Sequence, residues 1–263
     1  MRILFFFLMA IALPMAADTA VNDRPPGQSK TTTPVLVELF TSEGCSSCPP
    51  ADRLLERFDQ QPVQGAELIV LSEHVDYWNH IGWKDPYSAP LYSNRQKAYG
   101  DRFRLDSVYT PQMVIDGNSQ FVGSDTARAS KAIEDSLRAP KLRLDISLIP
   151  AKNGSGSQLQ IQTGTLEQSF GIHAAEVYVA YALNHAESQV SAGENSGHKL
   201  THVSVVTRLN RIGEIRQGEK FSQQLSLSQT SGSDARNGRV IVFVQEPHQG
   251  RVIGAAVTPI AGP

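Results

Sequence analysis

The first regular pattern of apolar and polar positions lies between residues 35 and 71. A compact apolar run at 35–40 has the composition of a β-strand. Residues 68–71 form a second short apolar run, which is typical of a buried parallel strand. Between these runs, four apolar residues recur at i, i+3, i+4 and i+7, namely Ala51, Leu54, Leu55 and Phe58. This spacing defines one face of an amphipathic helix, so the pattern predicts a strand–helix–strand unit.

Weaker patterns follow up to residue 140. They predict a helix over about 89–99, a strand at 113–115 after Pro111, and a short partner strand at 120–122. Asp116-Gly117-Asn118 between these strands is a turn signal. A last helix is predicted from residues that share an apolar face, namely Ala129, Ala132, Ile133 and Leu137. Residues 34–140 therefore have the pattern of an α/β domain.

Beyond residue 141 the period changes from that of helices to that of strands. Apolar residues alternate with polar ones over 142–148, 159–163, 177–183, 221–227 and 240–244. The spacers are rich in Gly, Ser and Asn, as at 153–156 and 231–233. Several strands without a convincing helix predict an all-β, sandwich-like domain over 141–263, with the boundary near Pro140.

The N-terminus has the pattern of a targeting segment. Arg2 precedes an apolar run over 3–13, and small residues follow up to Ala20. The run is short for a membrane span, so residues 1–20 are interpreted as a signal peptide and 21–33 as a flexible leader. A periplasmic or secreted protein is expected, with no membrane attachment after signal cleavage; an uncleaved anchor is the alternative.

The charge balance excludes one class of partner. The chain of 263 residues has 24 Lys and Arg against 26 Asp and Glu, a formal net charge of −2. No basic region is present that would attract nucleic acid or an anionic membrane surface. The function is therefore expected to depend on a local site.

The two cysteines are the strongest candidates for such a site. Cys45 and Cys48 are the chain's only cysteines, and they lie at the turn between the first strand and the first helix. A disulfide closing so short a loop constrains the unfolded chain little, which favours chemistry over scaffolding. Cys45 at the helix N-terminus is the expected nucleophile, and Cys48 the resolving thiol. Glu43 opposes a Cys45 thiolate, and Ser46-Ser47 supplies no cation, so a mildly lowered Cys45 pKa is expected.

Two other interpretations of the cysteine pair remain open. A Cys-x-x-C pair is half of a zinc site, and histidines could complete a Cys2His2 or copper site, with His74 and His80 nearest in the sequence. Alternatively the pair forms an inert structural disulfide. The helix-opening context favours redox chemistry, and no metal or organic cofactor is assigned.

The sequence around the cysteines resembles a known family. Residues 35–58, with Cys-Ser-Ser-Cys-Pro-Pro after a hydrophobic strand, look like the thioredoxin superfamily. More narrowly, the run from Glu38 to Asp52 resembles a bacterial family of exported thioredoxin-like proteins of unknown function. The matching motifs include His-Val-Asp-Tyr-Trp at 74–78, Gly-Trp at 82–83 and Tyr-Thr-Pro-Gln at 109–112. The resemblance covers most of 34–140 and implies a thioredoxin-like fold there, followed by a β-rich half.

The resemblance also implies roles for individual residues. Thioredoxin-like proteins place a cis-proline opposite the dithiol, and Pro111 after Thr110 matches it. The Thr110 backbone would then pair with an extended substrate strand beside Cys45. The superfamily often buries a carboxylate on the first strand near the resolving sulfur. Glu38 matches that position only with one inserted residue, and a solvent-facing Glu38 is the alternative.

An aromatic stretch after the second strand allows two interpretations. His74, Asp76, Tyr77, Trp78 and Trp83 follow a strand end, where α/β folds commonly place their sites. They would line a substrate groove, with His74 and Asp76 as a proton pair. The favoured interpretation is structural, because large aromatic side chains build cores. The polar loop at 193–198 and His202 just beyond it receive no chemical role.

The sequence thus predicts an exported thiol–disulfide oxidoreductase. Its partners would be protein thiols or disulfides and an unidentified redox partner. A copper-binding protein or metallochaperone using the same cysteines is one alternative. A non-catalytic binding protein with the same fold is another, and a buried, unreactive Cys45 would support it.

Overall fold

The computed structural model describes residues 32–150, 157–227 and 237–260. The expected signal peptide, nearly all of the leader and the two Gly- and Ser-rich spacers lie outside the described residues. The described residues belong to one compact unit that begins at Thr32. None of the helices in the described ranges is both long and apolar enough to cross a membrane.

The first half contains both helices and strands, close to their predicted places. Its elements are β1 (Thr33–Thr41), α1 (Pro49–Gln60), β2 (Ala66–His74), the short helix η1 (Asn79–Ile81), α2 (Pro90–Phe103), β3 (Gln112–Ile115), β4 (Ser119–Val122) and α3 (Thr126–Leu137). Proline in the first turn starts α1 and α2, where the missing N–H is not needed. Asp125 caps α3 by accepting a hydrogen bond from the Arg128 N–H at 3.0 Å.

The second half is built almost entirely from strands. Its elements are β5 (Leu144–Pro150), β6 (Ser157–Thr163), the short helix η2 (Gln168–Phe170), β7 (Ala174–Gln189), β8 (Lys199–Arg216), β9 (Ser222–Leu227), β10 (Gly238–Gln245) and β11 (Val252–Pro259). The sequence pattern predicted five of these strands but did not indicate β8 or β11.

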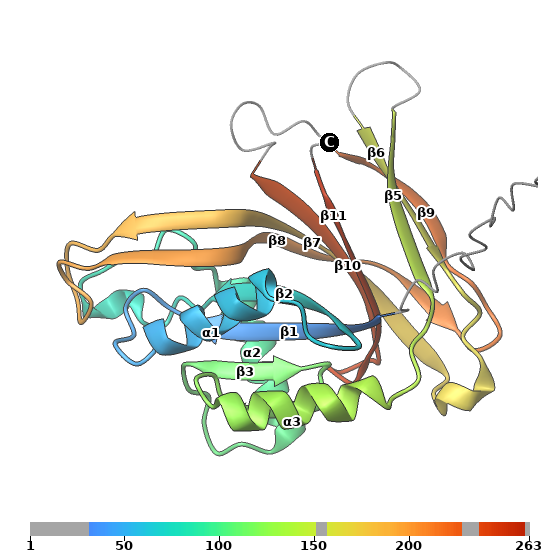
Figure 1. The fold of residues 1–263 in the computed structure, drawn as a ribbon, viewed down its shortest axis with the longest axis horizontal. Coiled ribbons are helices and arrows are strands. Elements are labelled where there is room, and N and C mark those ends of the chain that lie inside the picture. Colours follow the sequence, from blue (N-terminus) through green and yellow to red (C-terminus); the bar gives the residue numbers. More distant parts are fainter. Residues whose placement is uncertain (1–31, 151–156, 228–236, 261–263) are drawn as a thin grey trace, which may run out of the picture. The chain divides into compact units, whose positions relative to one another are not determined.

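Strand pairing crosses the boundary expected near residue 140. The large sheet has the order β11-β10-β7-β8-β2-β1-β3-β4, in which β8 pairs parallel with β2 at Ser72 and Val205. The second sheet has the order β5-β6-β9 (Figure 1). Instead of an α/β domain followed by a separate sandwich, the described chain is a mixed α/β unit. It has one large mixed sheet and a further antiparallel sheet.

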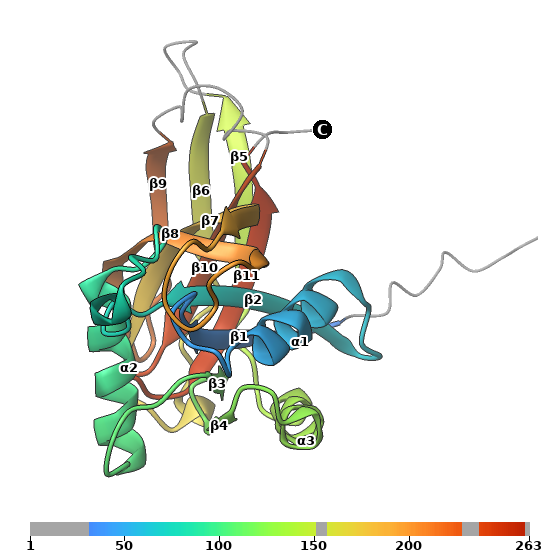
Figure 2. The same ribbon diagram turned by 90° about the vertical axis from the view of Figure 1, so that its left-hand side faces the viewer.

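The helices cover both faces of the β1 region. Val37 and Leu39 of β1 pack with Leu54 of α1 and Ile133 of α3, whereas Phe40 packs with Tyr99 of α2. Alternate residues of a strand point to opposite faces, so α1 and α3 lie on one face and α2 on the other (Figure 2). The turn between β1 and α1, which carries the cysteines, is thereby held by both layers.

A sandwich-like packing does exist within the second half. Apolar residues of β6 in the small sheet pack against apolar residues of β7 and β10 in the large sheet, and the buried set includes Leu159, Ile161, Val177, Val179, Val240 and Val242. This core is continuous with the sheet that carries β1 and β2. The alternating pattern therefore identified the inward-facing residues correctly, although it could not show that the larger sheet extends into the first half.

Candidate functional site

Cys45 and Cys48 form a disulfide at the turn between β1 and α1. Their Cα atoms are 5.4 Å apart, within the usual range for a disulfide. The Cys45 N–H donates to Ser42 O at 3.1 Å, and the Cys48 N–H donates to Cys45 O at 3.2 Å. Cys48 is the N-cap residue of α1, so Cys45 lies in the turn that precedes the helix and not within its first turn. The dithiol thus lies where the unpaired N–H groups of the helix begin.

Both cysteines are completely buried. Cys45 and Cys48 are each 0% exposed, although Ser46 and Ser47 between them are exposed. Cys45 is the expected nucleophile, and a nucleophilic thiolate must be accessible to its substrate. In this structure neither sulfur offers a path for an attacking thiolate, so exchange with a substrate requires a local opening.

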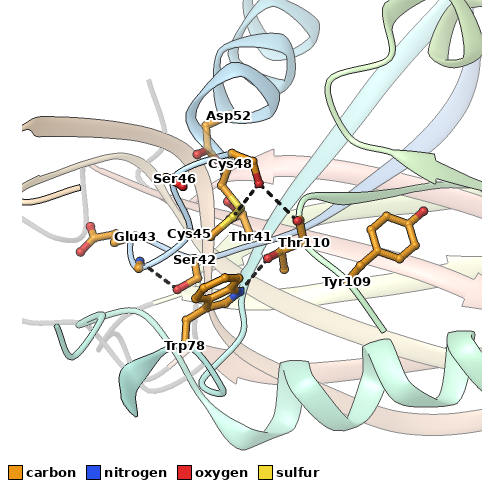
Figure 3. Close-up of a disulfide and its surroundings, with 12 residues drawn as sticks. Thr41, Ser42, Glu43, Cys45, Ser46, Cys48, Asp52, Trp78, Tyr109 and Thr110 are labelled. Atoms are coloured by element: carbon orange, nitrogen blue, oxygen red, sulfur yellow. Dashed lines mark hydrogen bonds between the residues drawn. A yellow bond between two sulfur atoms is a disulfide. The ribbon is translucent and has the colours of Figure 1, made fainter. Parts of the chain in front are cut away.

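The Thr110–Pro111 segment lies beside the disulfide. Its peptide bond is cis, as the resemblance implied. The Ser47 hydroxyl lies 3.3 Å from Cys45 Sγ and 3.5 Å from Thr110 O, which it reaches as a donor (Figure 3). The Trp78 indole N–H donates to the Thr110 hydroxyl at 2.7 Å. Two segments that are far apart in the sequence therefore meet at one place: the turn with Cys45 and Ser47, and the segment with Thr110 and Pro111.

Glu38 is buried, but it does not lie at the dithiol. Its carboxylate accepts hydrogen bonds from Arg95 Nε at 2.7 Å and from the Tyr99 hydroxyl at 2.6 Å, both on α2. Gln245 of β10 joins this network by donating to the Tyr99 hydroxyl. Since α1 covers the other face of β1, the role inferred for Glu38 near Cys48 is wrong. The network links β1, α2 and β10 and is structural.

His74 pairs with a carboxylate other than the expected one. Its Nδ1 lies 2.7 Å from Asp85 Oδ2, whereas Asp76 accepts a hydrogen bond from the Ser93 hydroxyl at 2.5 Å. Burial opposes ionisation of Asp85, but the charge of His74 and hydrogen bonds from His74 and the Glu43 N–H outweigh it and lower the pKa of Asp85. The His74–Asp76 proton pair is therefore replaced by a His74–Asp85 pair.

The two tryptophans contact the site through their N–H groups. Trp83 donates to Glu43 Oε2 at 2.8 Å, and Trp78 donates to Thr110 as described. Trp78 also packs on the turn itself, because a Cβ added to Gly44 would lie 3.0 Å from Trp78 Cβ. The tryptophan rings therefore support the dithiol turn from outside, and a substrate groove lined by the aromatic stretch stays a prediction.

The loop between β7 and β8 binds the same turn. The Asn195 side-chain amide donates to Glu43 O at 2.8 Å and to Cys45 O at 3.0 Å. Glu194 accepts a hydrogen bond from the Ser46 N–H at 3.0 Å, and hydrogen bonds from the Ser46 hydroxyl and N–H lower the pKa of Glu194. Sequence reasoning noticed this loop only as a polar segment. No local signal could connect it to cysteines about 150 residues away.

His202 at the start of β8 is a further buried residue of the site. It is 3% exposed. Its Nε2 lies 3.3 Å from Glu43 Oε1, and its Nδ1 lies 3.8 Å from Asp52 Oδ1. Asp52 also accepts a hydrogen bond from the Thr41 hydroxyl at 2.9 Å. Within the described residues, no group of three or more His, Cys, Asp or Glu side chains is arranged to hold a metal ion.

These features define a mixed α/β protein with a Cys-x-x-Cys disulfide at the start of a helix. The chain belongs to the family described as a protein of unknown function (DUF1223), whose family model matches residues 36–245. No curated protein matches the chain.

The solved structures that are similar to this chain include the following two. Protein AGR_C_4864 from Agrobacterium tumefaciens shares 25% sequence identity with a TM-score of 0.68, over 87% of this chain and 95% of that chain. HBP35 of Porphyromonas gingivalis shares 14% identity with a TM-score of 0.59, over 87% of this chain and 75% of that one. The likeness to HBP35 concerns the fold alone. The extent of the first match indicates that both halves of the chain belong to the shared architecture.

Proposed function

We propose that this protein is an exported thiol–disulfide oxidoreductase with a thioredoxin-like active site. The carrying observation is the position of the disulfide between the N-terminus of α1 and the cis Thr110–Pro111 segment, with Ser47 contacting both Cys45 Sγ and Thr110 O. Its substrates are protein thiols or disulfides in the periplasm or outside the cell. A separate redox partner regenerates the dithiol, and nucleic acid has no part in the activity.

The reaction proceeds through a mixed disulfide. In the reducing direction, the Cys45 thiolate attacks one sulfur of a substrate disulfide, and the other substrate sulfur leaves as a thiolate. Cys48 then loses its proton and attacks Cys45 Sγ, which forms the Cys45–Cys48 bond and releases the second substrate thiolate. Two electrons pass from the dithiol to the substrate. The Thr110 backbone and Pro111 form the edge against which an extended substrate docks.

One observation favours a second candidate, a non-catalytic binding protein. Both cysteines are 0% exposed, and a buried disulfide that never opens would be inert. The two candidates differ in whether the disulfide equilibrates with small thiols under conditions in which the protein stays folded.

A redox titration separates the two candidates. Purified protein is equilibrated in graded thiol–disulfide buffers, quenched, alkylated and counted by mass, with Cys45→Ser and Cys48→Ser as controls. The oxidoreductase is expected to show one reversible transition between about −120 and about −270 mV, the span of exchanging dithiols. A pair that stays oxidised below about −300 mV overturns the catalytic proposal and supports the binding protein. The expected activity is reduction of a protein disulfide, which either cysteine variant loses.

A further inference from the structure

Five buried ionisable side chains lie next to the dithiol and come from five separate segments. We call them the acid–histidine cluster: Glu43 before the cysteines, Asp52 in α1, His74 at the end of β2, Asp85 before α2 and His202 in β8. All are at most 8% exposed. The rings of His74 and His202 meet edge to face with centroids 4.7 Å apart.

Burial of the acid–histidine cluster lowers the stability of the folded state. Among the described residues, His74 Nε2 has no hydrogen-bond partner, and the ring nitrogens of His202 face the carboxylates of Glu43 and Asp52 at ion-pair distances without making hydrogen bonds. Buried polar atoms without partners reduce the stability of the folded state, so their presence calls for an explanation. Such atoms also occur in the Glu38–Arg95 network, because neither carboxylate oxygen of the buried Glu73 has a hydrogen-bond partner in the described part of the chain. The acid–histidine cluster differs from that network in its position beside the dithiol turn. Clustered buried ionisable groups at such a place are typical of functional sites.

The geometry favours the protonated form of His202. One ring nitrogen faces a carboxylate oxygen of Glu43 at 3.3 Å, and the other faces one of Asp52 at 3.8 Å. A neutral imidazole would turn one lone pair toward a carboxylate, whereas the imidazolium has an N–H on both nitrogens. Burial lowers the pKa of His202, but Asp52 and Glu43 outweigh it and raise the pKa to about 10. His202 is therefore a cation at neutral pH.

Both carboxylates that face His202 are attached to the dithiol turn. Glu43 is two residues before Cys45. Asp52 is four residues after Cys48 on α1, and side chains four apart lie on the same face of a helix. The Asp52 N–H also donates to Cys48 O at 3.1 Å, and Figure 3 shows Asp52 next to Cys48 at the start of α1. The two carboxylates that face His202 are thus carried by residues on either side of the dithiol.

We propose that His202 is a positioning residue of the dithiol: its buried positive charge balances Glu43 and Asp52 and thereby favours the Cys45 thiolate. Without this cation, two uncompensated carboxylates would oppose a third negative charge at Cys45. The immediate sequence around Cys45 contains no cation. The positive charge comes instead from His202 of β8, which is distant in the chain. The charged or titratable groups that face His202 are Glu43, Asp52, His74 and Tyr87. The role rests on the proposed redox function.

The test measures ionisation of Cys45 in a Cys48→Ser background, where Cys45 is the single thiol. Thiolate absorbance and the rate of alkylation are followed from about pH 4 to about pH 10. His202→Gln is expected to raise the apparent pKa of Cys45 by about one unit and to slow alkylation below that pKa about tenfold. His202→Lys, which keeps the charge, is expected to restore most of the rate. His185→Gln removes an exposed histidine of β7 and is expected to change nothing.

Two results would overturn the role of His202. The first is an unchanged Cys45 pKa in a folded His202→Gln protein. The second is an equal shift in the Gln and Lys variants, which would indicate a packing effect. Circular dichroism establishes that each variant is folded. Because alkylation needs no protein substrate, this outcome is independent of the redox titration, so failure of the charge-balancing role and failure of the oxidoreductase proposal are distinguishable.

Discussion

Glu43 shows how one residue can connect the whole site. Its Oε2 accepts from Trp83, its Oε1 faces His202, its N–H donates to Asp85, and its carbonyl accepts from Asn195. These partners come from three separate parts of the chain. In the sequence, the negative charge of Glu43 opposes a Cys45 thiolate. In the folded protein, the charge of His202 compensates that negative charge. The position of the Cys45 turn depends on this set of contacts.

His202 makes stability depend on pH. Its pKa is raised from 6.5 to about 10 on folding, so the folded state binds the proton more tightly than the unfolded state. The contribution to the free energy of unfolding is complete below pH 6.5 and is lost as the pH rises through about 10. Its upper bound is about 5 kcal/mol, because one pKa unit corresponds to about 1.4 kcal/mol.

Urea unfolding of the oxidised protein between these pH values checks this linkage. The free energy of unfolding is expected to fall with rising pH, and His202→Gln is expected to remove most of the slope. The difference between the two proteins should be largest at the low end of this range, near pH 6.5, and should be nearly lost at about pH 10. Parallel pH profiles for wild type and variant would contradict a protonated His202 in the fold.

The residues of the site differ in how far the sequence could reveal them. Cys45, Cys48 and Pro111 belong to short motifs with a local mechanism, so sequence reasoning brought them together. His202 and Asn195 have no such motif and join the site only because β8 pairs with β2. The sequence predicts Asp76 as the partner of His74 because the two residues are close in the chain. The observed partner of His74 is Asp85, which lies nine residues after Asp76.

At the scale of elements, the β7–β8 hairpin is the main addition to what the pattern predicted. β8 escaped detection because it is buried over five consecutive residues, 202–206, and carries exposed arginines farther along. A strand between two neighbours loses the simple alternation on which sequence prediction depends. β11 was missed for a different reason: small residues such as Gly254 and Ala255 give little apolar signal. The register shifts between β7 and β8 also interrupt the alternation of inward-facing and outward-facing residues.

The tip of this hairpin is expected to limit access to the disulfide. Asn195 holds the backbone on both sides of Gly44, and a Cβ on Gly193 would lie 3.3 Å from Trp83 Cβ. Asn195→Ala removes two hydrogen bonds without removing any apolar packing. The tip should then open more often, since local opening is easiest where few contacts hold a segment.

Reduction by a small dithiol or a phosphine measures this opening. Asn195→Ala is expected to speed reduction of the Cys45–Cys48 disulfide about fivefold to thirtyfold, since two hydrogen bonds contribute about 1–2 kcal/mol. Ser196→Ala is the control, because the exposed Ser196 hydroxyl donates, among the described residues, only to Ser191 O within the same loop. Equal reduction rates in all three proteins would show that the hairpin tip does not restrict the disulfide.

At the scale of the whole molecule, contacts across the residue-140 boundary hold the two halves together. The Tyr92 hydroxyl of α2 donates to Val206 O of β8 at 2.6 Å, and Arg239 of β10 pairs with Asp59 of α1. One apolar cluster joins Leu36 of β1 and Leu71 of β2 to Phe243 of β10. The described part of the chain is therefore expected to unfold as one cooperative unit. A destabilising substitution in β10 should then lower the unfolding midpoint at the dithiol as well.

Phe243→Ala tests this coupling. Phe243 is 0% exposed and stacks on Tyr178 with ring centroids 5.1 Å apart. Its truncation leaves a cavity and is expected to cost about 3–5 kcal/mol. Trp78 and Trp83, the chain's only tryptophans, both lie in the first half beside the dithiol turn. Their fluorescence is expected to report an unfolding midpoint lowered to the same extent as that seen by circular dichroism, which senses the strands of both halves. Independent halves would instead leave the tryptophan transition at its wild-type midpoint while the circular dichroism splits into two steps.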